Sequence, residues 1–141
     1  MSSIVDRALR LWTEPVAEGT AGLESFRAVY NDPLDVNGET TPLQVLVERA
    51  RMLQAAFEGL RSEIKEEFSA PGRRAFAFRL SGRHVGTLMT PLGEIPPSGR
   101  ELSWAGMDIF LVDDHGERIA GVWALADLLA LLMDAGAITL R

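Results

Sequence analysis

Apolar residues follow two different spacings along this chain, one typical of helices and one typical of strands. Up to Gly59 they recur every three or four positions. Helices are therefore expected over three segments, residues 4–12, 20–30 and 41–59. At the start of the last segment we expect Thr41 to cap the helix, Pro42 to take the first helical position and Gln44 to complete a capping box with Thr41. A short strand is expected before it, over residues 34–37.

From Leu60 onward apolar and polar residues alternate, which indicates strands with one buried face. The apolar faces of three long strands carry Leu60, Ile64 and Phe68, then Phe76, Phe78, Leu80 and His84, then Leu102, Trp104, Asp108, Phe110 and Val112. A tight turn at residues 113–116, a strand over 118–123 and a leucine-rich helix over 125–135 follow. Helices followed by an antiparallel meander predict an α+β fold. We expect its sheet to curl around the long third helix and to enclose an apolar pocket.

The composition restricts the class of protein. A chain of 141 residues, 47% hydrophobic and 24% charged, is typical of one globular domain over residues 1–141. Its net charge of −6 argues against nucleic-acid binding, which needs a basic surface. Cysteine is absent and there are two histidines, which argues against disulfides, a cysteine nucleophile or a histidine-rich metal centre. Because neither a signal-peptide pattern nor an apolar run of about 20 residues occurs, we expect a cytoplasmic protein that is not bound to a membrane.

Asp108 gives the strongest indication of chemistry. It lies on a strand face between Trp104 and Phe110, where the alternation requires an apolar side chain. Burial there raises the pKa of a carboxyl that has no compensating partner. One interpretation is a general acid or base, or a hydrogen-bond donor to a developing oxyanion. The other is a structural carboxylate that bonds to a neighbouring strand or to Arg118.

Other polar residues are weaker candidates. His84 continues an apolar strand face between two glycines, although a lone histidine there is more often part of the core. Asp35 and Asn37 share a face of the short strand and point either into a pocket or into water. Glu66 is expected on the apolar face of the first long strand, and Glu63 on its solvated face. The chain contains no phosphate loop, serine nucleophile elbow or metal-ligand spacing.

Several short motifs occur in a fixed order in the second half. They are residues 79–86 (RLSGRHVG), 96–100 (PPSGR), 106–110 (GMDIF), 116–119 (GERI) and the pair Trp123 and Asp127. Together they resemble the SnoaL-like polyketide cyclase family over residues 43–138. Ser98 stands in place of the usual threonine, and Ala124 stands where many members carry an acid. The resemblance implies an NTF2-like α+β cone, a homodimer, and a site without metal or organic cofactor.

Residues 30–38 (YNDPLDVNG) are similar to the branch of this family that acts on polyethers and related polyketides. Members of that branch open epoxides or form pyran and carbon rings. The epoxide-opening members use acidic pairs, which by position correspond to Asp35 and Asp108, with Glu63 or Glu66 as a third candidate. The resemblance thus implies ring closure in a polyketide substrate by acid–base catalysis. The alternative is a non-catalytic NTF2-like module for ligand binding or dimeric interaction.

The expected site combines acids with aromatic walls. Its expected catalytic residues are Asp108, Asp35, Glu66 and His84. Its expected substrate contacts are Trp12, Tyr30, Asn37, Glu63, Phe78, Trp104 and Trp123. No residue is expected to bind a metal. The opposite face of the sheet, which a second copy is expected to cover, carries Ala105, Met107, Ile109, Leu111, Ala120 and Val122.

Overall fold

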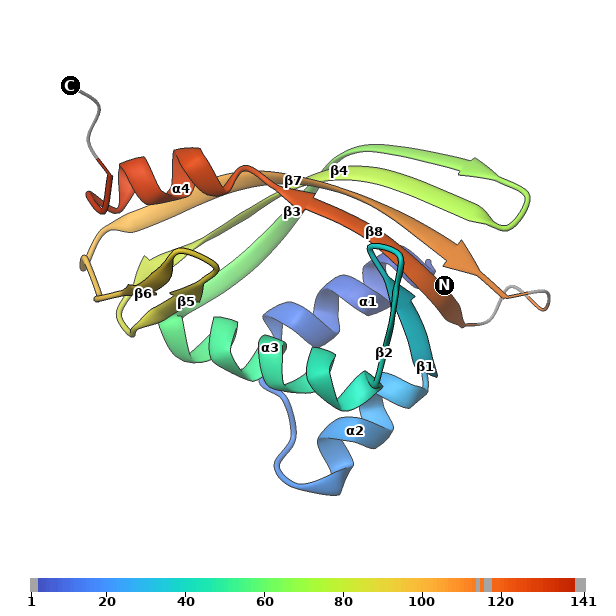
Figure 1. The fold of residues 1–141 in the computed structure, drawn as a ribbon. Helices are drawn as coiled ribbons and strands as arrows, with labels where there is room; N and C mark the ends of the chain where they lie inside the picture. The colour runs from blue at the N-terminus through green and yellow to red at the C-terminus, as the bar shows by residue number, and fades with distance from the viewer. Residues whose placement is uncertain (1–2, 114, 116–117, 139–141) are drawn as a thin grey trace.

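The computed structural model describes residues 3–113, 115 and 118–138 (Figure 1). Its helices are α1 (Ile4–Thr13), α2 (Thr20–Arg27), α3 (Leu43–Ala56) and α4 (Leu128–Asp134). The third helix ends at Ala56 instead of Gly59, because strand β3 begins at the next residue. The turn expected at residues 113–116 lies partly outside the described residues. Within the described part of the chain, no helix is long and apolar enough to cross a membrane.

The start of α3 differs from the expected capping box. Pro42 takes the N-cap position, and the Thr41 hydroxyl donates to the backbone carbonyl of Glu39 instead of capping the helix. A carboxylate from an earlier segment supplies the cap, since Asp32 accepts a hydrogen bond from the Leu43 backbone N–H at 3.1 Å. This long-range contact ties the start of α3 to the first strand.

Six strands form one sheet in the order β2–β1–β8–β7–β4–β3. Their bounds are β1 (Tyr30–Val36), β2 (Glu39–Thr41), β3 (Phe57–Ala70), β4 (Arg73–His84), β7 (Glu101–Val112) and β8 (Ile119–Ala126), while β5 (Leu88–Thr90) and β6 (Gly93–Ile95) pair separately. Strands β1 and β8 are parallel and the other neighbours are antiparallel. The fold is therefore α+β with a mixed sheet, and the expectation of a wholly antiparallel one was wrong. The parallel pair arises because the chain leaves the sheet after β2 and returns, through the meander, to place β8 beside β1.

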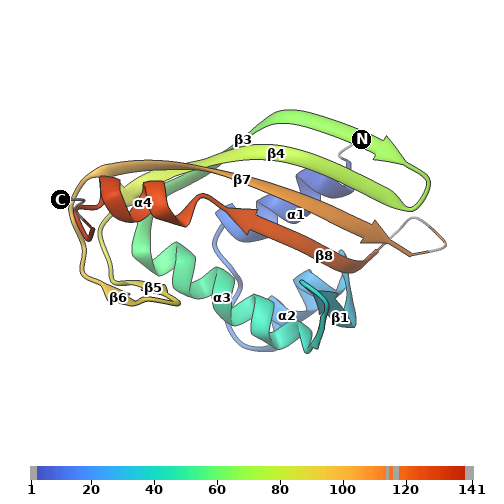
Figure 2. The same cartoon turned by 45° about the horizontal axis from the view of Figure 1, so that its top comes forward.

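The sheet arches over α1 and α3, and the core lies between the sheet and these helices (Figures 1 and 2). The alternation placed the inner faces of β4 and β7 correctly, since Phe76, Phe78, Leu80, Trp104 and Phe110 are all buried there. Helices α1 and α3 pack their apolar stripes against this face, as their amphipathic spacing predicts.

Two register shifts move residues to the face opposite the expected one. After Ile64 the pairing of β3 with β4 shifts, so that Glu66 lies opposite Ala77 on the outer face. A shift between β7 and β8 leaves Val122 buried on the inner face and Trp123 exposed on the outer face. One extra residue in a strand reverses the alternation of every residue beyond it. The expected inner position of Glu66 and outer position of Val122 were therefore wrong, and Trp123, an expected substrate contact, lies exposed on the outer face.

Candidate functional site

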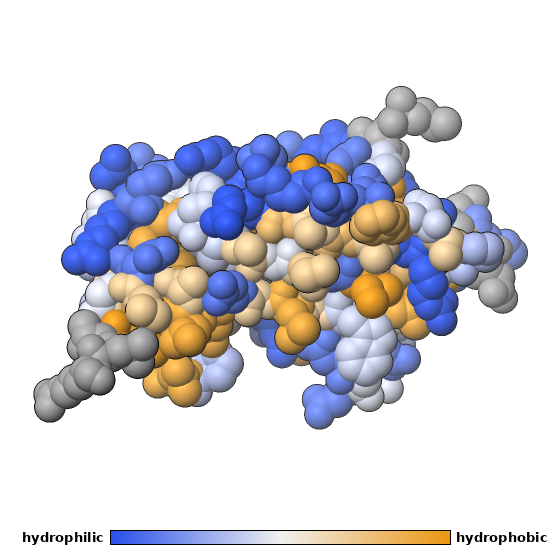
Figure 3. Space-filling model, turned by 90° about the horizontal axis from the view of Figure 1, so that it is seen from above, coloured by the Kyte–Doolittle hydropathy of each residue, from blue (hydrophilic) through white to orange (hydrophobic). Residues whose placement is uncertain are grey.

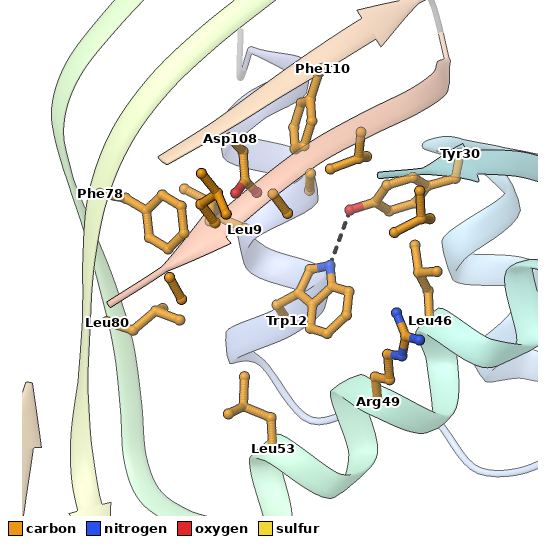
Figure 4. A pocket seen from close by; sticks show the side chains of 16 residues that line it. Leu9, Trp12, Tyr30, Leu46, Arg49, Leu53, Phe78, Leu80, Asp108 and Phe110 are labelled. Carbon is orange, nitrogen blue, oxygen red and sulfur yellow. Dashed lines mark hydrogen bonds between the residues drawn. The ribbon is translucent and has the colours of Figure 1, made fainter. Parts of the chain in front are cut away.

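A cavity of about 290 Å³ lies between the inner face of the sheet and helices α1 and α3 (Figure 4). Its walls come from α1, α3, β1, β4, β7 and β8, and most of the lining side chains are aliphatic or aromatic. Four lining side chains carry polar groups: Trp12, Tyr30, Arg49 and Asp108. An apolar enclosure with a few polar groups is typical of a small-molecule site.

Asp108 projects from β7 into this cavity, between Phe78 and Phe110 (Figure 4). No residue that the structure describes forms a hydrogen bond or ion pair with its carboxyl. Arg118, the expected structural partner, lines a different groove beside Asp32. Burial therefore raises the pKa of Asp108 from 3.8 to about 7. Near neutral pH both protonation states are populated, so this carboxyl can accept or donate a proton.

Tyr30 supplies a second polar group to the same cavity. The Trp12 indole N–H donates to the Tyr30 hydroxyl oxygen at 3.0 Å, and the Tyr30 ring stacks on Phe26 at 5.9 Å. Burial raises the pKa of Tyr30 far above its ordinary value; the hydrogen bond from Trp12 opposes this rise and the nearby Asp108 charge adds to it. The hydroxyl therefore stays protonated. Because Trp12 is the donor in their bond, the Tyr30 hydrogen is left to donate to a ligand oxygen.

His84 and Trp104, both expected in the site, are buried in the core and do not line this cavity. The His84 Nδ1 atom accepts a hydrogen bond from the Ser98 backbone N–H at 3.1 Å, and it lies 2.9 Å from the Ser98 hydroxyl. Burial lowers the pKa of His84, so the ring is neutral. The rings of His84 and Trp104 both pack against the Phe57 ring, with centroids 5.5 Å and 4.9 Å from its own. In this position His84 links the motif over residues 96–100 to the end of β4.

The other expected site residues do not line the inner cavity. Asp35 is exposed and accepts a hydrogen bond from Thr40, and Glu63 is exposed and forms an ion pair with Lys65 at 2.8 Å that lowers its pKa. The side chains of Asn37, Glu66 and Trp123 line a hollow on the outer face of the sheet. The structure therefore brings Trp12, Tyr30, Phe78 and Asp108 together in the inner cavity, and leaves the remaining expected residues outside it.

Asn37 has a structural contact of its own. Its side-chain oxygen accepts a hydrogen bond from the Ala124 backbone N–H at 2.8 Å, and its backbone N–H donates to the carbonyl of Val122 at 2.9 Å. Its backbone adopts a left-handed conformation with φ of 51°. Asn37 thus fastens the end of β1 to β8.

Arg49 is a lining residue that the sequence reasoning did not identify. It lies on α3 between Leu46 and Leu53, which both line the cavity at helical spacing. A basic residue three positions after one leucine and four before another, on the stripe that faces the core, is a detectable signal. Among the residues that the structure describes, no group of three or more histidine, aspartate or glutamate side chains is arranged to hold a metal ion.

Solved structures share this architecture. TsrD from Streptomyces laurentii is 21% identical, with a TM-score of 0.78 over 96% of this chain and 93% of that chain. A SnoaL-like polyketide cyclase from Agrobacterium tumefaciens str. C58 is 16% identical, with a TM-score of 0.70 over 95% and 98% of the two chains. An NTF2-like protein of unknown function from Exiguobacterium sp. 255-15 is 14% identical, with a TM-score of 0.63 over 89% and 98%. At these identities the likeness defines the fold, which is NTF2-like.

The sequence itself identifies the family. The model of the SnoaL-like polyketide cyclases matches residues 9–135. The chain therefore belongs to the SnoaL-like polyketide cyclase family. Among curated proteins, no sequence matches it significantly.

Proposed function

We propose that the protein closes a carbon ring in a polyketide chain and that Asp108 moves the proton. The observation that carries this proposal is the Asp108 carboxyl, which has no partner among the described residues and lies inside an apolar cavity, where burial raises its pKa to about 7. Membership of the family supports a polyketide as the substrate. The apolar walls favour a folded conformation of a mostly uncharged chain, and such positioning contributes to the rate.

In the proposed reaction, ionised Asp108 first takes a proton from a carbon between two carbonyl groups. The resulting enolate carbon attacks another carbonyl carbon of the same chain, so that one carbon–carbon bond forms and the negative charge moves to that carbonyl oxygen. The Tyr30 hydroxyl stabilises this charge by donating a hydrogen bond. Protonated Asp108 then returns the proton to the oxygen, and the product is an isomer of the substrate.

Opening an epoxide, as in the polyether branch, fits this cavity less well. That reaction was expected to pair Asp108 with Asp35, Glu63 or Glu66. Among the residues that line the cavity, Asp108 is the only acid. A single carboxyl near its pKa can act first as base and then as acid. Epoxide opening by a hydroxyl instead needs a base for the hydroxyl and an acid for the epoxide oxygen at the same time. We therefore favour carbon-ring closure over epoxide opening.

The proposal can be tested in the native host by replacing the codon for Asp108 with one for alanine. We expect the Asp108→Ala strain to accumulate an open-chain isomer of the cyclic product, with the same mass and a different retention time. The purified wild-type protein should convert this isolated compound to the ring. A strain that carries Asp134→Ala provides the matched control, because Asp134 is an exposed acid on α4 and does not line the cavity.

Unchanged production of the cyclic compound by the Asp108→Ala strain would contradict the proposed role of this residue. Binding of the open-chain compound without its conversion would instead favour the non-catalytic module. Circular dichroism of the purified variants checks that each remains folded, so that a loss of activity is not a loss of structure.

We also propose that a second copy covers the outer face of the sheet. Large apolar side chains on this face are between 42% and 79% exposed, and they are Phe68, Met107, Ile109, Trp123 and Leu125. Figure 3 looks onto this face and shows apolar side chains gathered across its middle, with hydrophilic ones along its border. Apolar patches of this kind usually mark an interface, and a two-fold dimer would bury the same patch on both copies.

Light scattering at micromolar concentration tests this dimer. We expect a dimer for the wild type and a monomer for Met107→Glu, because the substitution places a charge from each copy in the apolar interface. Leu92→Glu is the control, since Leu92 is 72% exposed but belongs to the turn between β5 and β6. A monomeric wild type would contradict the proposed interface.

A further inference from the structure

An arginine lies on the inward stripe of α3. Arg49 lines the cavity together with Leu46 and Leu53 of the same helix, and it is also exposed to solvent. Its guanidinium therefore lies at an opening of the cavity. Figure 4 shows the group extending from α3 to a position between Trp12 and Leu46, while Asp108 enters from the sheet on the other side.

The charge of Arg49 is not balanced by any acid that the structure describes. It forms no hydrogen bond or ion pair with a described residue. Among the described arginines, Arg27 and Arg61 have acidic partners, Glu24 at 2.7 Å and Glu101 at 2.6 Å. Because the chain has six more acids than bases, a lack of acidic residues does not explain an unpaired cation beside apolar side chains.

We propose that Arg49 binds a carboxylate of the substrate, so that the polyketide enters this cavity as a free acid. The inference rests on the proposed function, because it assigns one end of the same substrate. The acidic end would lie at α3, and the carbon that loses a proton would lie at Asp108. The apolar residues between them would contact the rest of the chain.

The guanidinium is suited to this task because its planar fork forms two parallel hydrogen bonds with the two oxygens of a carboxylate. A phosphate on a carrier tether offers the same geometry, but it brings about two negative charges at neutral pH. Arg49 is the only cation among the residues that line the cavity. One guanidinium balances a carboxylate fully and a phosphate only in part, so we favour the carboxylate.

Three probes with one ring system test the inference: 2-naphthoate, methyl 2-naphthoate and 2-naphthyl phosphate. Their affinities are measured by calorimetry at one fixed pH and low salt for the wild type and for Arg49→Gln. Because a hydrogen bond to a charged group is stronger than one between neutral groups, wild type should bind 2-naphthoate at least about tenfold more tightly than its ester. Arg49→Gln should bind the two compounds equally. Arg49→Lys should restore part of the preference, because it keeps the charge and loses the fork.

Arg7→Gln is the matched control. It removes the same charge from an exposed position on α1 that does not line the cavity, and we expect it to retain the full preference for 2-naphthoate. A preference that Arg7→Gln and Arg49→Gln lower equally would reflect net charge alone and would overturn the inference. Stronger Arg49-dependent binding of 2-naphthyl phosphate than of 2-naphthoate would overturn the choice of a carboxylate.

The binding experiment with Arg49 variants and the test of the proposed function can fail independently of each other. If wild type binds the acid and the ester equally, the role of Arg49 is wrong while ring closure through Asp108 still stands. If the Asp108→Ala strain still makes the cyclic product, the proposed reaction is wrong even where binding of 2-naphthoate depends on Arg49. If no probe binds, both the inference and the proposed apolar site fail.

Discussion

Replacing Asp108 with asparagine is expected to stabilise the folded protein at alkaline pH and to leave its stability nearly unchanged at acidic pH. Burial raises the pKa of Asp108 from 3.8 to about 7, so the folded state holds this proton more tightly than the unfolded chain does. As the pH rises from about 4 to about 7, only the unfolded chain releases the proton, and the free energy of unfolding falls. Asparagine stays neutral and avoids this loss.

The size of the effect follows from the pKa. A difference between 3.8 and about 7, at about 1.4 kcal/mol for each pKa unit, corresponds to about 4 kcal/mol. Water reaches part of this side chain, which is only partly buried. We therefore expect the free energy of unfolding of Asp108→Asn to exceed that of the wild type by about 2–4 kcal/mol at about pH 8, and by less than about 0.5 kcal/mol at about pH 3.

Urea unfolding followed by tryptophan fluorescence at several pH values measures this difference, with the protein concentration held constant because an oligomer's stability depends on it. Asp134→Asn is the control, since it removes an exposed acid from α4. Other titrating groups affect the wild type and the variant alike, so they cancel in the difference. If the difference in the free energy of unfolding between the wild type and Asp108→Asn does not vary with pH, the raised pKa of Asp108 is refuted.

Further substitutions test the packing around the cavity by urea or thermal unfolding. Gly106→Ala should destabilise the protein by about 1–3 kcal/mol, because the added Cβ would overlap the Phe78 ring; an unchanged midpoint would contradict this contact. Gln54→Ala should lower the free energy of unfolding by about 2 kcal/mol, because the Gln54 amide donates to three backbone carbonyls at the end of α1. A loss below about 0.5 kcal/mol would show that water replaces these bonds. Ser98→Ala should cost about 1 kcal/mol through the lost hydroxyl contact with His84, and a stability equal to that of the wild type would remove this role of Ser98.

Regular alternation was enough to find the main chemical feature of the site. Strands β4 and β7 keep their register over their whole shared length, so a period of two placed Phe78 and Asp108 on the same buried face. The helices followed from their amphipathic spacing for the same reason. These features depend on residues close together in the sequence.

Features that depend on distant segments were not predictable in this way. The register shift in β3 moved Glu66 to the outer face, and nothing in the local pattern marks it. Asp35 was expected beside Asp108 from its position in a family motif, but its side chain is exposed and bonds to Thr40. The helical spacing of Arg49 from Leu46 and Leu53 is a local signal, but its place in the same cavity as Asp108 follows only from the packing of α3 against the sheet.

The pH dependence of ring closure by the wild type and by Asp108→Asn tests proton transfer by Asp108 most directly. The substrate is the open-chain isomer from the Asp108→Ala strain, and kcat/KM is measured across neutral pH. We expect the wild-type rate to change with an apparent pKa of about 7, the value that burial gives this carboxyl. Asp108→Asn should lose about 10²–10⁴-fold, the usual contribution of a positioned acid or base. If folded Asp108→Asn closes the ring at the wild-type rate, Asp108 does not transfer the proton.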